Sequence, residues 1–388
     1  MARTFEHILI IGGGAGGALA HDLTQRGFRV TLAEKGELLS GASGRHHGLL
    51  HSGARYALHD IDTAAECLRE NQILRRIASQ ALEPNGGLFV ALSRRDLSYY
   101  EPFLDHCRQA DIPVQPLTKD QALALEPALN PKLLAAVQVP DAVMDAFRLA
   151  LQFFAAAKAA GAVIRPFNEV VGLLQQQGSI IGARVRDLRR DRLTEIRADL
   201  VVNAAGAWAG KIAALAGLHV PLQPGPGVMV AVQGRLCDRV INRLQPAGEG
   251  DIIVPQRRLS ILGTTAWLAD DPDRVEIPDD HGPRLMALGA LLMPALHRLT
   301  SHARWSASRP LLKSGSQQDP MRISRGFVCL DHSARDGLEG LITLIGGKAT
   351  TVRAMAEKAA DLICHKTGRK RTCRTGQTVL PSYRAYWR

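Results

Sequence analysis

The sequence predicts an α/β fold in which a nucleotide-binding domain with a parallel sheet carries an inserted, β-sheet-rich second domain. The first observation is a glycine-rich turn between an apolar strand and a helix near the N-terminus. The second is a proline-rich segment of short apolar runs, from about residue 221 to residue 326. The third is a late apolar strand, residues 340–348, that ends in another glycine turn. Because strand–turn–helix units occur near both ends, we expect the chain to leave the first domain and return to it.

The N-terminal strand and its turn carry the strongest signal. Residues 8–11 are apolar and precede the sequence GGGAGG, which includes Gly12, Gly14 and Gly17. In a Rossmann-like unit the first glycine permits a sharp turn, the second lets N–H groups approach a pyrophosphate, and the third lets the helix pack close to the strand. Glu34 ends the next predicted strand, where a carboxylate can bind a ribose. A plain strand–helix–strand turn is the alternative, but the flanking strands and the acid together predict a dinucleotide site and argue against NADP.

The other elements of the first domain follow from apolar periodicity. Residues 199–203 form a buried-type strand, and residues 204–208 turn out of it, either to pass close to a cofactor or simply as a tight turn. The sequence QQQG indicates a hairpin turn between two β-rich runs. Helices are predicted over residues 63–80, 147–160 and 350–364.

The predicted elements divide the chain into two domains and a tail. Short β-type runs, such as residues 251–254 and 259–263, distinguish the proline-rich segment from the regions on either side. We therefore predict that this segment belongs to a substrate domain inserted into the nucleotide-binding domain. The predicted boundaries are 1–84, 145–220 and 326–370 for the nucleotide-binding domain, 85–144 and 221–325 for the substrate domain, and 371–388 for a basic C-terminal tail.

The formal net charge of +11 is unevenly distributed. Residues 362–388 contain seven basic residues and no acidic one. Such a segment can touch an anionic membrane surface or a partner, but a solvated, mobile end is the interpretation that we favour. Nucleic-acid binding finds little support, because basic and aromatic residues do not alternate as a base-stacking surface requires.

Composition excludes several other classes. No run reaches the roughly 18 to 20 apolar residues of a membrane span. The N-terminus does not resemble a secretory signal, because Glu6 interrupts it and its apolar run is the first predicted strand. The six cysteines form no CxxC pair, so zinc, iron–sulfur and disulfide sites are not expected and a reducing cytoplasm is the default.

A segment rich in small and polar residues, 41–56, contains most of the candidate chemistry. Its small residues have N–H groups that can line a phosphate and the edge of a cofactor ring. Arg55 and Tyr56 could hold an anionic substrate, and His51 could move a proton. The three histidines at positions 46, 47 and 51 do not predict a metal site, because no carboxylate or cysteine stands at ligand spacing.

Two further cations are candidates for binding an anion. Pro310 restricts Arg309 to an extended conformation, which projects the guanidinium in a fixed direction. Lys348 follows the late glycine turn. A guanidinium and an ammonium together match a phosphate or a carboxylate, although for a single arginine a surface salt bridge is the more common role.

The chain resembles the FAD-dependent glycerol-3-phosphate dehydrogenase family, and most of all the catalytic (A) subunit of the anaerobic enzyme. The resemblance runs in order over nearly the whole chain, and one departure is His46, where the relatives usually have Asn. The matching stretches are GASGRHHGLLHSGARYA, CLRENQILRRIA, LVVNAAGAW, DIIVP with LGTT, SRPL, CLDHSARDGLEGLITLIGGK and MAEKAADLIC.

The resemblance implies a D-amino-acid-oxidase-like flavoprotein with non-covalent FAD. It further implies hydride transfer from C2 of glycerol 3-phosphate to flavin N5, which gives dihydroxyacetone phosphate. The residues implied to hold the substrate are Arg55, Tyr56, Arg309 and Lys348, and His51 is the candidate base that the residues of segment 41–56 themselves suggest. Those implied to bind FAD are Gly12, Gly14, Ala15, Gly17, Glu34, Lys35, Ser43, Gly44, His47, Gly48, Leu49, Val170, Ala205, Gly206, Trp208, Gly346, Gly347, Lys348 and Ala349.

The route of the electrons beyond FAD stays open. The relatives continue past residues 380–381 into a cysteine-rich domain that this chain lacks, so the expected acceptor is a quinone, a partner subunit or an external compound. A 2-hydroxy-acid or amino-acid oxidase of the same fold is one alternative, and a flavin-bearing subunit that is inactive without its partner is another. We expect a cytoplasmic protein, associated at most peripherally with the inner face of the cell membrane.

Overall fold

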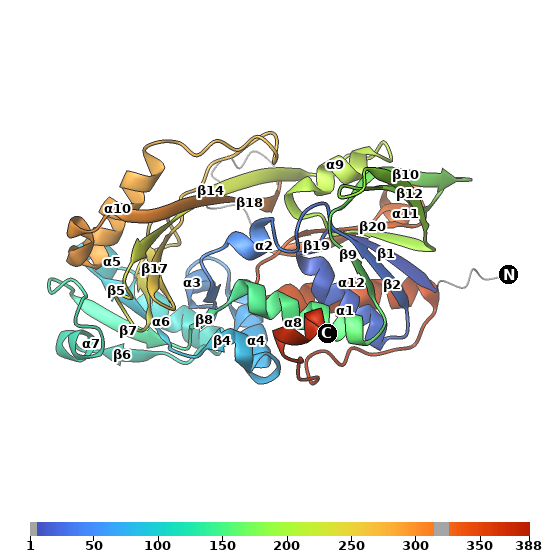
Figure 1. The fold of residues 1–388 in the computed structure, drawn as a ribbon. Coiled ribbons are helices and arrows are strands. Elements are labelled where there is room, and N and C mark those ends of the chain that lie inside the picture. Colours follow the sequence, from blue (N-terminus) through green and yellow to red (C-terminus); the bar gives the residue numbers. More distant parts are fainter. Residues whose placement is uncertain (1–5, 314–325) are drawn as a thin grey trace.

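The computed structural model describes residues 6–313 and 326–388 and places two large sheets at opposite ends of the molecule (Figure 1). The first is a six-stranded sheet in which all neighbours are parallel except the pair formed by β19 and β20. The carboxyl ends of its parallel strands therefore meet at one edge. Its order is β19 (Phe327–Asp331), β20 (Leu341–Gly346), β13 (Leu200–Asn203), β1 (His7–Ile11), β2 (Arg29–Ala33) and β9 (Val163–Arg165).

Both faces of this sheet are covered, which explains the unbroken apolar run of β1. Ile8 and Ile10 belong to a core shared with the helices α1 (Ala15–Gln25), α8 (Ala146–Ala159) and α12 (Val352–Thr367). Leu9 and Ile11 point the other way, because successive side chains of a strand alternate between its faces. There they meet a three-stranded sheet of β10 (Asn168–Gln176), β11 (Ser179–Asp187) and β12 (Arg192–Arg197). The hairpin turn predicted from QQQG joins β10 to β11 and is confirmed.

The packing of α1 corrects the role that we predicted for Gly17. A Cβ on Gly16 would lie 2.9 Å from the Ile10 side chain, so Gly16 is the residue that lets α1 approach the strand. A Cβ on Gly17 would instead lie 2.9 Å from the Phe154 ring on α8. Adjacent helix residues point about 100° apart, and the motif spacing alone does not say which of two neighbouring glycines faces the sheet.

An eight-stranded sheet forms the other end of the molecule. It combines strands from the two segments that we assigned to the substrate domain, and helix α10 (His281–Leu292) packs on it. The order is β18 (Ser301–Leu312), β14 (Leu222–Gln233), β17 (Leu259–Gly263), β16 (Ile252–Gln256), β15 (Val240–Arg243), β5 (Gly87–Ala91), β7 (Ala135–Val139) and β6 (Gln115–Leu117).

Short elements connect the two large sheets. A small sheet of β3 (Leu49–Leu50), β8 (Ala142–Met144) and β4 (Leu82–Glu83) lies between them. Two short helices, α2 (Ala42–Arg45) and α3 (Ala54–Ala57), flank β3, and the longer α4 (Ile61–Ile77) follows. Among residues 6–313 and 326–388, no helix is both long enough and apolar enough to cross a membrane.

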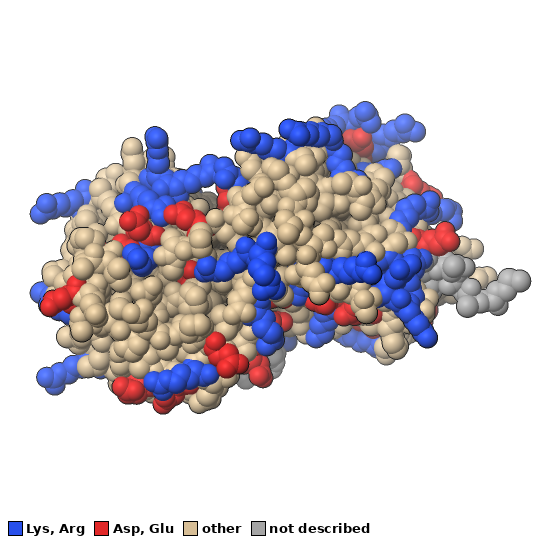
Figure 2. All heavy atoms as spheres, turned by 90° about the horizontal axis from the view of Figure 1, so that it is seen from below, with Lys and Arg blue, Asp and Glu red and all other residues tan. Residues whose placement is uncertain are grey.

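The basic C-terminal segment is packed against the nucleotide-binding domain, so our preferred interpretation of a mobile, solvated end is wrong. Leu380 is 3% exposed, and its N–H donates a hydrogen bond to the Ile77 carbonyl at 2.8 Å. The short helix η4 (Tyr383–Trp387) packs on α8. Basic side chains are spread over this face of the molecule, with smaller groups of acidic ones between them (Figure 2).

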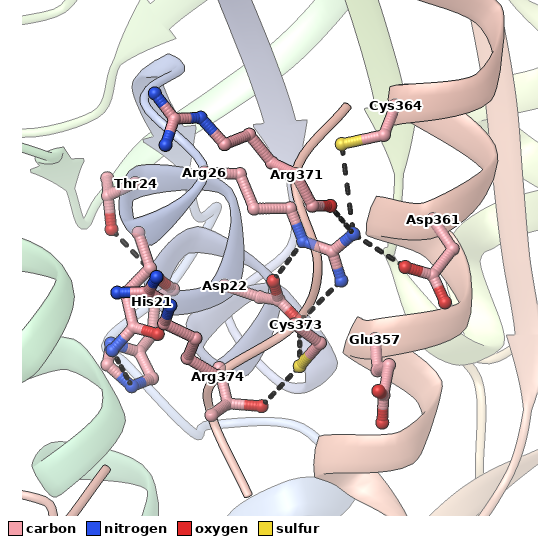
Figure 3. Close-up of polar contacts among 12 residues, drawn as sticks. His21, Asp22, Thr24, Arg26, Glu357, Asp361, Cys364, Arg371, Cys373 and Arg374 are labelled. Carbon is pink, nitrogen blue, oxygen red and sulfur yellow. Dashed lines mark hydrogen bonds and ion pairs between the residues drawn. The ribbon is translucent and has the colours of Figure 1, made fainter. Parts of the chain in front are cut away.

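Ion pairs and hydrogen bonds within the protein explain why this basic segment packs on the folded chain and does not extend into solvent. Lys366 forms an ion pair with Asp331 at 2.7 Å. The buried Arg26 guanidinium joins Asp22 on α1 to Asp361 on α12, at 2.5 Å each, and donates a hydrogen bond to the Arg371 carbonyl at 3.2 Å (Figure 3). These partners come from residues far apart in the sequence, so the run of basic residues alone does not reveal them.

Substitution of Leu380 tests this packing. We expect Leu380→Ala to lower the free energy of unfolding by about 2 to 5 kcal/mol, the usual effect of truncating a buried leucine. The neighbouring Val379 is 71% exposed, and Val379→Ala is expected to change it by less than about 0.5 kcal/mol. Urea unfolding of both variants measures the difference. Equal stabilities would mean that the segment is detached in solution.

Candidate active site

Three glycine-containing turns meet at the edge of the six-stranded sheet where the parallel strands have their carboxyl ends. They follow β1 at Gly12, β13 at Ala204 and β20 at Gly346. Gly12 has φ +103°, and a Cβ there would lie 2.5 Å from the Ala204 carbonyl oxygen, so the first two turns are in direct contact. The helices α1 and α12 begin beside these turns with N–H groups that have no intrahelical partner. This edge can therefore receive an anionic group such as a pyrophosphate.

The Glu34 carboxylate lies at the same edge. Its Oε2 accepts a hydrogen bond from the Gly13 N–H at 2.6 Å, and its Oε1 accepts one from the Gly36 N–H at 2.9 Å. These two bonds hold the carboxylate between the first glycine turn and the loop after β2. The ribose-binding role of Glu34 stays a prediction.

A small cleft lies between the glycine turn, α2, α8 and the start of α12. Gly14 and Ser43 face each other across it, because a Cβ on Gly14 would collide with the Ser43 hydroxyl. Ala349 and Val352 line the cleft from the start of α12. Small side chains, two helix N-termini and one carboxylate are the features that an FAD dinucleotide requires, so the residues present fit this cofactor.

Three of the residues predicted to bind FAD have side chains engaged elsewhere. Lys35 forms an exposed ion pair with Glu169 at 3.0 Å. Val170 is buried in the core beneath the three-stranded sheet. The Trp208 indole donates a hydrogen bond to Asp273 at 2.7 Å. The structure therefore gives these three side chains partners outside the glycine turns.

Most of the remaining predicted FAD positions lie along the turns described above. Gly346 and Gly347 have φ of +83° and +85°, so the late turn needs glycine at both positions, and the main-chain N–H of Lys348 donates a hydrogen bond to the Thr351 hydroxyl at 3.3 Å. Gly44 and Gly48 are tightly enclosed, because a Cβ on either would collide with a backbone carbonyl. The others occupy the turn after β13, the start of α1 and the segment that leads into the first residue of β3, namely Ala15, His47, Leu49, Ala205 and Gly206.

Four of the five predicted catalytic residues lie together beside this edge. The rings of His51 and Tyr56 are 5.2 Å apart, and the Lys348 ammonium lies 5.1 Å from the centre of the Tyr56 ring. The His47 ring lies 6.1 Å from that of His51. The Arg55 guanidinium is near enough to His51 to lower its pKa. The structure therefore brings the segment 47–56 against the start of α12.

His51 is held in its neutral form. Burial is the largest cause that lowers its pKa well below the usual value, and the positive charges of Arg55 and Lys348 lower it further. Its main-chain N–H donates a hydrogen bond to the Thr350 hydroxyl at 3.1 Å. Within the described part of the chain, its Nδ1 atom is buried without a hydrogen-bond partner. A neutral imidazole of this kind can accept a proton.

Arg309 lies on β18 in the extended conformation that Pro310 predicts, and this prediction is confirmed. Its guanidinium donates hydrogen bonds to the carbonyls of Thr265 at 3.0 Å and Gly225 at 3.3 Å, and to the Thr264 hydroxyl. The fifth predicted catalytic side chain is thus anchored to the end of β17 and to β14.

The sequence interpretation missed three residues at this site. Gly16, not Gly17, allows α1 to approach the sheet, and Thr350 binds the His51 main chain. Asp251 forms an ion pair with Arg55 at 2.7 Å. A signal for Asp251 was present, because it is the single acid at the head of the apolar stretch DIIVP. Its partner, however, lies 196 residues away in the sequence.

Comparisons with known proteins identify the family of this chain. A family model described as FAD dependent oxidoreductase matches residues 7–362. The A subunit of anaerobic glycerol-3-phosphate dehydrogenase from Escherichia coli K12 is 42% identical over 377 residues, which cover 96% of this chain and 70% of that protein. The A1 subunit of the enzyme of that name from Haloferax volcanii is 41% identical, with coverages of 96% and 66%.

Solved structures show the same fold. The glycerol-3-phosphate dehydrogenase of Bacillus halodurans complexed with FAD has a TM-score of 0.73 at 24% identity, covering 97% of this chain and 68% of that one. The L-alpha-glycerophosphate oxidase of Mycoplasma pneumoniae with FAD bound has a TM-score of 0.76 at 20% identity, with coverages of 98% and 99%. The predicted Rossmann-like FAD fold is therefore confirmed. The chain belongs to the family of FAD-dependent oxidoreductases, and within it to the group formed by the A subunits of anaerobic glycerol-3-phosphate dehydrogenases.

Proposed function

We propose that this protein oxidises glycerol 3-phosphate to dihydroxyacetone phosphate, with non-covalent FAD as the immediate hydride acceptor. The observation that carries the proposal is the neutral His51 beside the cations Arg55 and Lys348. Several cations suit a phosphate dianion, whereas one would be enough for the carboxylate of a hydroxy acid or an amino acid. The 42% identity to a protein named glycerol-3-phosphate dehydrogenase points to the same substrate.

The residues divide the chemistry between binding and proton transfer. FAD, when bound, supplies the acceptor for the hydride from C2 of the substrate. Arg55 and Arg309 bind the phosphate or the developing alkoxide, and Tyr56 helps to hold the substrate. Neutral His51 accepts the hydroxyl proton. Lys348 contributes positive charge, which favours the reduced cofactor and a neutral imidazole.

Dye reduction by the purified, FAD-loaded protein tests the proposed substrate. We expect turnover with glycerol 3-phosphate and none with 2-hydroxy acids or amino acids. Turnover with an amino acid or a hydroxy acid instead would favour an oxidase of the same fold. Turnover that begins only when a partner protein is added would favour a flavin-bearing subunit that is inactive alone.

We also propose that the electrons leave FAD for a quinone, a partner subunit or an external acceptor, in the cytoplasm or at the inner face of the cell membrane. The relatives named above are subunits, which supports a partner. The exposed basic residues of the C-terminal segment would provide the docking surface. Because this segment also packs in the core, a truncation would destabilise the fold and would not be a clean test.

Charge removal is the cleaner experiment. The residues Lys370, Arg374 and Arg384 are exposed, and we expect their joint replacement by Gln to weaken co-sedimentation with anionic vesicles or with the partner, by up to about 1 kcal/mol per residue. Association of the unaltered protein should also weaken as salt is raised. A control variant removes the same charge from the substrate domain, at Arg94, Arg95 and Arg298. If both variants bind equally, docking uses another surface.

A further inference from the structure

Arg55 is held by a loop of the substrate domain, although it belongs to the segment that carries His51. Its Nη2 atom donates a hydrogen bond to Asp251 Oδ1 at 2.7 Å and another to the Gly248 carbonyl at 3.2 Å. Both acceptors lie in the loop between β15 and β16. The Arg55 side chain is 10% exposed, so most of it is enclosed by protein.

Asp251 ties this loop together as well as binding Arg55. Its other carboxylate oxygen, Oδ2, accepts a hydrogen bond from the Gly248 N–H at 2.8 Å. The carboxylate is 1% exposed, and a buried carboxylate is retained only where paired charges and hydrogen bonds offset its desolvation. The Arg55 guanidinium, the Asp251 carboxylate and the Gly248 peptide thus form a closed ring of hydrogen bonds with little freedom to rotate.

This ring uses one part of the guanidinium and leaves another part available. A guanidinium has five N–H donors, and the two on Nη2 are occupied by Asp251 and Gly248. Within the residues that the structure describes, Nη1 and Nε of Arg55 make no hydrogen bond. The Nε–H group and the two N–H groups of Nη1 can each donate a charge-assisted hydrogen bond to a phosphate oxygen. Because Nη2 is held by the loop, the positions of these remaining donors are fixed too.

The loop that contains Asp251 is also hydrogen-bonded to the segment that holds Arg309. The Gly250 N–H donates a hydrogen bond to the Thr264 carbonyl at 3.3 Å, and the Thr264 hydroxyl accepts one from Arg309. Arg55 and Arg309 come from different domains of the proposed division, yet they are anchored to two neighbouring loops. A shift of Asp251 would therefore alter the position of Arg55 relative to Arg309.

We infer that Asp251 is a positioning residue for binding of the substrate phosphate, acting by fixing the Arg55 guanidinium so that its Nε–H and Nη1 N–H groups can donate to the phosphate. This inference rests on the proposed function. A positioning role predicts that removal of the Asp251 carboxylate weakens phosphate binding, whereas a purely electrostatic role predicts the opposite. A carboxylate that only reduced the positive charge of the site would weaken phosphate binding, so its removal would tighten binding.

The test is binding of inorganic phosphate to the FAD-loaded protein, measured by titration calorimetry, together with KM and kcat for glycerol 3-phosphate. For Asp251→Asn we expect the Kd for phosphate and the KM to rise roughly tenfold, with a smaller change in kcat. Unchanged or tighter phosphate binding overturns the inference. The matched control is Asp96→Asn, since Asp96 is also 1% exposed and paired with an arginine, Arg243, at 3.0 Å. In that variant, the Kd for phosphate and the KM should stay within about twofold of those of the unaltered protein.

A double-mutant comparison keeps the inference testable if Asp251→Asn folds poorly. Removing both partners avoids an unpaired buried charge. The Arg55→Ala/Asp251→Asn protein should therefore be more stable to unfolding than Asp251→Asn. If Asp251 acts through Arg55, the double variant binds phosphate as weakly as Arg55→Ala alone and no weaker. A further loss in the double variant overturns the inference.

The two proposals fail in different ways. Phosphate binding that depends on Asp251, without turnover of glycerol 3-phosphate, contradicts the proposed function only. Normal turnover with phosphate binding that is insensitive to Asp251→Asn contradicts the positioning role only.

Discussion

The Gly12→Val variant is expected to be colourless as purified, because it cannot hold FAD. Gly12 has φ +103°, a conformation that a β-branched residue rarely adopts. Its Cβ would lie 2.5 Å from the Ala204 carbonyl oxygen and 2.8 Å from Ala205 Cα, both of them backbone atoms that cannot rotate away. The turn after β1 and the turn after β13 would have to separate. We therefore expect loss of most of the visible flavin absorbance relative to protein.

A control variant at a second glycine distinguishes the effect of backbone strain from the effect of this steric collision. Gly161 also has a positive φ, +93°, but a Cβ there would meet no heavy atom within 4 Å. Gly161→Val should therefore lower stability yet remain yellow and saturable with FAD. A yellow Gly12→Val protein with a full complement of FAD would contradict the cofactor site. Acid precipitation of the unaltered protein should release the flavin, and flavin that stays on the chain would contradict non-covalent binding.

Replacement of His51 by Asn is expected to lower kcat by roughly 10²- to 10⁴-fold, the usual contribution of a general base. The variant removes the imidazole that we propose as the proton acceptor, while Arg55 and Arg309 remain to bind the phosphate. KM should therefore change much less than kcat. Stopped-flow reduction of the bound flavin by glycerol 3-phosphate measures the affected step directly.

The pH profile gives a second measure of the same role. Burial and nearby cations hold the pKa of His51 well below 6.5, so this group stays neutral and able to accept a proton until the pH falls well below that value. In the unaltered protein, the acid limb that belongs to His51 should lie below pH 6.5. That limb should disappear in His51→Asn, whereas any limb from the substrate phosphate should persist in both proteins.

His46 provides the matched control. It lies in the same segment, and burial lowers its pKa to about 4, so it too is neutral near pH 7. Its ring lies 6.3 Å from that of His47 and not in the group formed by His51, Tyr56 and Lys348. His46→Asn should keep kcat within a few-fold of the unaltered protein. A large loss in both variants, or in neither, would show that His51 is not the specific base.

Local sequence was enough to predict the elements that build the cofactor edge. The strand over residues 8–11, its glycine turn and the terminal Glu34 lie within one short stretch, so their spacing places them together once strand and helix form. The strand before residue 204 and the strand before residue 347 were likewise evident from unbroken apolar runs. Parallel strands of one sheet present their carboxyl ends at the same edge, which makes their convergence predictable.

Other features were evident only from the tertiary structure, because they depend on partners that are distant in the sequence. The pairing of Arg55 with Asp251, the burial of Leu380 and the anchoring of Lys366 all join segments that come together only when the chain has folded. The neutral state of His51 also depends on how deeply it is buried, which residue type does not specify. Spacing along the chain determines local geometry, whereas desolvation and ion pairing depend on distances in space, and for that reason the sequence predicted the cofactor edge but not the support of its substrate site.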